Sequence, residues 1–219
     1  MSVIELLQRI PGGYWAVLAG FTLAWVSARL VDKSLRGQVT DRLWSGLVIL
    51  LLSMRYSGLL LHPNWLFHLN LAMLPGIPVP NGWVAAVGLC LLYFAISLVK
   101  MRNVSGFEGA LTAAVLAGLT GFYATRALLD PGWIGLEEAL SAWVMGILFI
   151  LGRFLPLFAP AHRVWGVAGL AVLLLERVAP SPLYLGLSLE QWIALVMLLI
   201  SLGDEAWRDL HETQRNIPF

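Results

Sequence analysis

The chain has 219 residues, of which 59% are hydrophobic and only 12% are charged, and its formal net charge is +1. A soluble domain has about 25% charged residues, so this composition predicts an all-α, polytopic membrane protein rather than a soluble one. The near-neutral charge offers no basic surface for nucleic acid. The single cysteine, Cys90, lies in an apolar run, which excludes a disulfide framework and a thiolate metal cluster. We expect no metal and no cofactor.

Seven apolar segments are predicted to cross the membrane as helices. They are Tyr14–Val31, Leu43–Leu61, Gly82–Val99, Phe107–Leu129, Ile134–Phe158, a short sixth segment beginning with Trp165–Leu175, and Ser188–Gly203. Together they predict a membrane domain over residues 1–203. The charged residues 204–219 are predicted to form an interfacial helix at the membrane surface. The first residues lack the basic cluster and cleavage pattern of a signal peptide, so we expect no cleavage there.

The basic residues predict how the chain is oriented. Ten of the fourteen Lys and Arg residues fall on one side of the predicted bundle, in the loops after the first, third and fifth segments and in the tail. Basic residues concentrate on the cytoplasmic side of a membrane. The N-terminus is therefore predicted to face outward and the C-terminus the cytoplasm, in a bacterial-type cytoplasmic (inner) membrane that the chain crosses several times.

The remaining four basic residues are Arg9, near the N-terminus, and Arg55, Arg126 and Arg177, which fall on the outer side within or at the ends of predicted segments. Arg55 interrupts the second segment about two turns from its outer end, where a charge costs about 2.5–3.5 kcal/mol on insertion scales. Arginine binds phosphate through two parallel hydrogen bonds. The three side chains therefore predict a site for a phospholipid headgroup. The alternative is that Arg126 and Arg177 extend to the interface and that Arg55 pairs with a carboxylate, with Glu137, Glu138 and Glu176 as the candidates.

Other features have simpler interpretations. His62 and His68 lie in the outer stretch between the second and third segments, where a neutral imidazole could act as a base, although interfacial histidines are usually only solvated. Small residues form one surface of the fourth segment, including Gly109, Gly118 and Gly121, and predict close helix packing.

The order of several elements resembles the prolipoprotein diacylglyceryl transferase family over most of the chain. The resemblance lies in the basic stretch SARLVDKSLRGQVTDRLW, in Ser53-Met54-Arg55 where the family has Gly-Ala-Arg, and in Pro80-Asn81-Gly82-Trp83 where it has Phe-His-Gly-Gly. The stretches KMRNVSGFEGALTAAVLAG and LLLERVAPSPLYLGLSLEQWIALVMLLISL resemble later family elements. The resemblance also implies seven spans with the N-terminus outside.

The resemblance implies a transferase that moves diacylglyceryl from phosphatidylglycerol to the cysteine of a lipoprotein precursor. It adds Asn81 and Gly82 to the three arginines as substrate-binding candidates. The family's histidine, however, is Asn81 here, and an amide is not a base near neutral pH. His62, His68 and Glu176 are the remaining candidate bases.

Two other functions stay open. The first is a catalytically silent member of the family that binds an anionic lipid or a membrane protein partner. The second is a subunit of a transporter, in which the charge of Arg55 would line a path through the membrane.

Overall fold

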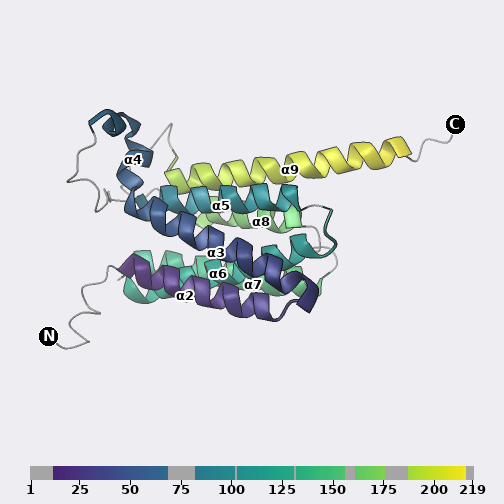
Figure 1. Ribbon diagram of the computed structural model, residues 1–219, viewed down its shortest axis with the longest axis horizontal. Helices are drawn as coiled ribbons and strands as arrows, with labels where there is room; N and C mark the ends of the chain where they lie inside the picture. Colours follow the sequence, from purple (N-terminus) through teal and green to yellow (C-terminus); the bar gives the residue numbers. More distant parts are fainter. Residues whose placement is uncertain are drawn as a thin grey trace.

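The computed structural model is built of helices (Figure 1) and describes residues 12–68, 82–101, 103–130, 132–155, 161–175 and 187–215. The helices are α2 (Gly12–Arg29), α3 (Lys33–Arg55), α4 (Ser57–Leu61), the 3₁₀ helix η1 (Pro63–His68), α5 (Gly82–Lys100), α6 (Phe107–Leu129), α7 (Trp133–Phe154), α8 (Ala161–Leu175) and α9 (Leu189–Arg215). The predicted all-α class is confirmed.

The seven long helices run side by side in alternating directions (Figure 1). Following the contacts gives the order α2, α6, α7, α8, α9, α5, α3 and back to α2, so the helices close a ring. In addition, α6 contacts α3, α5 and α8. Its side chains Phe107, Leu111 and Leu116 are fully buried, which makes α6 the central helix of the bundle.

Glycines allow α2 and α6 to pack closely. A Cβ atom at Gly20 would lie 2.7 Å from the backbone oxygen of Gly118, and one at Gly121 would lie 3.1 Å from the oxygen of Ala19. The small-residue surface predicted for the fourth segment is therefore a packing surface at Gly118 and Gly121. It does not extend to Gly109, where a Cβ would meet nothing within 4 Å.

Two of the described helices, α6 and α7, are long and apolar enough to cross a membrane. Two shorter apolar stretches, Val84–Lys100 and Ala161–Leu175, correspond to the third and sixth predicted segments. Length and composition alone also fit core helices of soluble proteins. The bounds of α6 match the predicted segment Phe107–Leu129, whereas crossing by all seven segments stays a prediction.

The structure corrects the predicted basic loop after the first segment. Helix α3 begins at Lys33, so most of that stretch is its first turns. The reason is amphipathic patterning: Val39 and Leu43 face the core, whereas Lys33 and Gln38 are exposed. Helix α9 continues through Gly203 to Arg215 and projects beyond the bundle (Figure 1), whereas an interfacial position of residues 204–219 stays a prediction.

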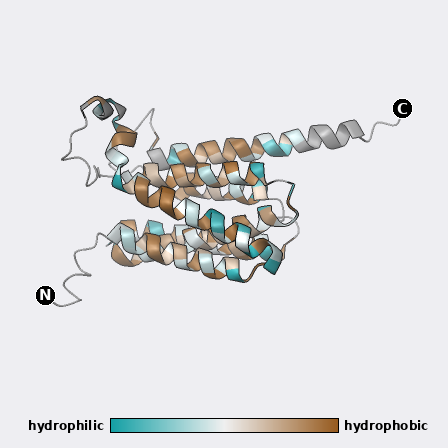
Figure 2. Cartoon of the chain, viewed as in Figure 1, coloured by the Kyte–Doolittle hydropathy of each residue, from teal (hydrophilic) through white to brown (hydrophobic). Residues whose placement is uncertain are grey.

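The two ends of the bundle differ in charge. One end, here called the basic end, is where α2 ends and α3 begins, and it carries Arg29, Lys33, Lys100, Arg153 and Arg163. Hydrophilic segments gather toward this end, on the right of Figure 2, while hydrophobic residues follow the helices between the ends. The opposite end is where α2 begins and α3 ends.

Candidate functional site

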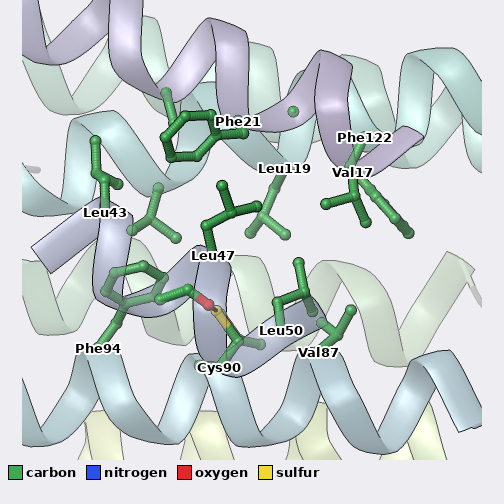
Figure 3. Close-up of a pocket in the computed structure, with 16 residues that line it drawn as sticks. Val17, Phe21, Leu43, Leu47, Leu50, Val87, Cys90, Phe94, Leu119 and Phe122 are labelled. Atoms are coloured by element: carbon green, nitrogen blue, oxygen red, sulfur yellow. Dashed lines mark hydrogen bonds between the residues drawn. The ribbon is translucent and has the colours of Figure 1, made fainter. Parts of the chain in front are cut away.

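An apolar cavity lies between α2, α3, α5 and α6 (Figure 3). It encloses about 100 Å³ and is partly open to the outside of the bundle. The larger side chains of its wall include Phe21, Leu43, Leu47, Phe94, Leu119 and Phe122.

Small residues create this cavity. Gly20 and Gly118 lie on its wall at the α2–α6 contact, and Gly46 of α3 faces the ring of Phe94. The Cys90 thiol donates a hydrogen bond to the backbone oxygen of Gly46 over 3.5 Å, which ties α5 to α3. As expected from the sequence, Cys90 is a buried packing residue. The wall offers almost no polar partner, so the cavity suits an apolar group.

Arg55 lies at the opposite end of the bundle, as the last residue of α3. The helix ends there because Tyr56 leaves helical geometry, with φ −111° and ψ 26°. The Arg55 side chain is exposed and its guanidinium lies 5.9 Å from the centre of the Tyr56 ring. The prediction that Arg55 sits two turns deep in a continuous helix is therefore wrong, since the break at Tyr56 brings it to the helix end. In that position the guanidinium can reach a lipid phosphate.

Arg126 is held by two carboxylates. Its Nε donates to Oδ2 of Asp130 over 2.7 Å, and its Nη2 lies 3.2 Å from Oε1 of Glu138 in α7. The side chains of Arg126 and Glu138 are only 17% and 12% exposed, so this ion pair joins α6 to α7 away from bulk water. The sequence offered Glu138 as a partner for Arg55, whereas in the structure it pairs with Arg126. Two nearby carboxylates compensate the positive charge that an anion would need.

The remaining predicted site residues are only partly described. The exposed His62 follows α4, and its ring stacks on Trp65 with centroids 4.8 Å apart. His68 ends η1, and Gly82 is a buried residue at the start of α5. Three predicted residues lie outside the described residues: Asn81, Glu176 and Arg177. Among the described candidates, Arg55, His62, Gly82 and Arg126 all belong to the end of the bundle opposite the basic end.

Sequence reasoning missed a second polar cluster, at the basic end. His162 and Arg163 open α8 and meet Asp204 and Glu205 of α9. Hydrogen bonds from Arg163 and His162 lower the pKa of Glu205 to about 2. The available signal was one pair of basic residues and one pair of acidic residues. The contact between the two pairs was not predictable from the sequence, because Arg163 and Glu205 are 42 positions apart in the chain.

A scan against protein-family models, a search of curated proteins and a search of solved structures each gave no match for this chain. The resemblance to the diacylglyceryl transferase family therefore rests on the residue order quoted above and stays a prediction.

Proposed function

We propose that the protein is a seven-span membrane protein that binds one anionic phospholipid, with a tail in the α2–α3–α5–α6 cavity and the phosphate at Arg55. The observation that carries the proposal is the cavity itself. Its wall is apolar and partly open, and α3, which supplies Leu47 and Leu50 to that wall, also carries Arg55. The five residues from Leu50 to Arg55 correspond to about 7.5 Å along a helix, a short step between the start of a tail and a headgroup.

The outer surface of the bundle supports a membrane environment. Large apolar side chains point outward along α7, where Trp143 is 71% exposed and Phe154 is 76% exposed. The pattern recurs on α8, α9 and α5, for example at Leu174, Leu199 and Leu92. Leaving such a side chain in water instead of burying it costs about 1.5–3 kcal/mol of free energy. Many outward-facing apolar side chains, with small residues at helix contacts, fit hydrocarbon surroundings.

The basic end supports the proposed orientation. It faces the cytoplasm if basic residues follow their usual distribution, which directs the N-terminus outward and the C-terminus inward. Arg55 then lies near the outer leaflet, where phosphatidylglycerol supplies the phosphate. Surrounding lipid is as apolar as the cavity wall, so the tail gives little selectivity. Contact between the guanidinium and the headgroup gives the preference for an anionic lipid.

The resemblance adds a chemical step to this binding site, which we propose as transfer of diacylglyceryl from phosphatidylglycerol to the thiol of a lipoprotein precursor. The sulfur forms a bond to the terminal carbon of the diacylglyceryl group, and glycerol phosphate leaves with the electrons of the broken carbon–oxygen bond. The thiol proton goes to a base. Among the described residues His62 is the candidate base, because its exposed imidazole is at the same end as Arg55. Arg55 would stabilise the departing phosphate.

Lipid selectivity tests the binding proposal. The purified protein in detergent is titrated with phosphatidylglycerol or phosphatidylcholine, and binding is measured by native mass spectrometry. We expect the wild type to prefer phosphatidylglycerol and Arg55→Gln to bind it about tenfold more weakly, which corresponds to about 1.4 kcal/mol. The matched control is Arg29→Gln, because Arg29 lies at the basic end, away from Arg55. There its guanidinium carbon is 4.3 Å from the centre of the Trp25 ring. That variant should keep the preference, and equal binding of both lipids by the wild type would refute the anionic site.

The same preparation tests the chemistry. Incubation with phosphatidylglycerol and a lipoprotein-precursor peptide should add one diacylglyceryl group to the peptide cysteine. An unchanged peptide mass, together with a retained preference for phosphatidylglycerol, would refute the transfer step and leave lipid binding alone.

A further inference from the structure

His162 is a buried imidazole enclosed by two carboxylates from another helix. It is only 8% exposed, and it lies in the first turn of α8 at the basic end. Its Nε2 contacts Oε2 of Glu205, and its Nδ1 lies 3.2 Å from Oδ2 of Asp204. Both ring nitrogens therefore lie near carboxylate oxygens of α9, but only Nε2 is hydrogen-bonded, and Nδ1 has no hydrogen-bond partner among the described residues.

The surrounding groups hold this arrangement in place. Arg163 binds Glu205 through two nitrogens, with Nη2 2.6 Å and Nε 3.1 Å from Oε1. From α9, the Ser201 hydroxyl donates to the backbone oxygen of His162 over 2.5 Å. From α6, Glu108 accepts a hydrogen bond from the backbone N–H of Ala161 over 3.1 Å. The last turn of α7 carries one basic residue, Arg153, which is exposed.

The geometry fits a protonated imidazole. An imidazolium donates to Glu205 from Nε2 and places its positive charge beside Asp204, whereas a neutral imidazole has no charge, one N–H and one lone pair. On loss of the proton, one ring nitrogen would turn its lone pair toward a carboxylate oxygen. That contact changes from attraction to repulsion, and the positive charge that balanced the acidic pair is lost.

The two carboxylates lie where α9 leaves the bundle. The helix continues from them through residues 206–215, here called the α9 extension, and its end projects past the other helices (Figure 1). The contacts of Asp204 and Glu205 with α8 therefore lie at the base of this extension.

We propose that His162, Asp204 and Glu205 form a proton-operated latch, which holds the base of the α9 extension against α8 when the imidazole is protonated and releases it when the imidazole is neutral. Histidine is the side chain whose charge changes between about pH 5 and 8. Within the latch, the lowered pKa of Glu205, about 2, keeps that carboxylate charged throughout this range. The latch is thus closed at low pH and opens as the pH rises. It is independent of the proposed lipid site, which involves the opposite end of the bundle.

Hydrogen exchange of the full-length protein tests the latch. Amide protection of residues 206–215 is measured at pH 6.0 and 8.0 and corrected for the intrinsic pH dependence of exchange. We expect protection to fall about tenfold at the higher pH, as for the loss of one charge-assisted hydrogen bond. In His162→Gln the amide still donates to Glu205 but does not titrate, so protection should not change with pH.

Two further variants keep the test decisive. His211→Gln removes a histidine from the extension itself and should retain the full response. Asp204→Asn offers the neutral ring a donor in place of a carboxylate, so it should reduce the response even if His162→Gln fails to fold. A wild type whose protection does not change with pH would overturn the latch. So would a pH response that persists in both His162→Gln and Asp204→Asn, or one that disappears in His211→Gln.

Discussion

Replacing Leu47 by tryptophan is expected to remove the bound phospholipid. Leu47 points into the cavity from α3, and its partners across the space come from α2, α5 and α6 (Figure 3). The larger indole would occupy the space proposed for a lipid tail, because packed interiors leave little room for adjustment. We expect the fraction of protein that retains a phospholipid in native mass spectra to fall at least about tenfold, or about 1.4 kcal/mol.

The neighbouring residue gives a matched control. Val48 is on the same helix but is 52% exposed, so Val48→Trp adds the same side chain to the outside of the bundle. This variant should retain lipid as the wild type does. Equal retention by Leu47→Trp and Val48→Trp would contradict a tail in the cavity, and equal loss in both would point to a general effect of tryptophan on α3.

Gly20→Leu is expected to have the largest effect on stability. Even the first side-chain atom at this position would lie 2.7 Å from the backbone oxygen of Gly118 and 3.3 Å from the backbone nitrogen of Phe122. Backbone atoms of α6 cannot move aside without separating the two helices. We expect a loss of about 3 kcal/mol, which for a chain of this length lowers the melting temperature by roughly 6–12 °C.

Gly109→Leu is the control for this change. Gly109 lies on α6 as well, but a Cβ atom there would meet nothing within 4 Å. Thermal unfolding followed by circular dichroism in detergent should give a wild-type melting temperature for Gly109→Leu. A wild-type melting temperature for Gly20→Leu would mean that α2 and α6 do not approach each other at this point.

The helices themselves were largely predictable from local sequence. The apolar run of α6 ends before Asp130-Pro131-Gly132, and its predicted and observed bounds agree. The start of α3 was not predictable in the same way. Its first turns are charged, and they are helical because Val39 and Leu43 are buried against other helices. Burial by distant partners outweighs local polarity here, and no local pattern contains that information.

The candidate sites depended still more on contacts that sequence spacing does not give. The sequence offered Glu137, Glu138 and Glu176 as partners for Arg55, but the relative register of α6 and α7 decides that Glu138 pairs with Arg126. The cavity needs four helices that are not all consecutive in the chain. For the proposed lipid site, the sequence identified Arg55 but not its position at a helix end, since the break at Tyr56 is a feature of the folded backbone.

Photo-crosslinking tests the central claim, a phospholipid tail inside the bundle, most directly. The protein is reconstituted with a phosphatidylglycerol that carries a photoreactive group on its tail, irradiated and digested, and adducts are located by mass spectrometry. Adducts on cavity residues of at least two different helices, such as Leu47 of α3 and Leu119 of α6, are the predicted result. Adducts confined to outward-facing residues such as Trp143 and Ile147 of α7 would contradict the claim.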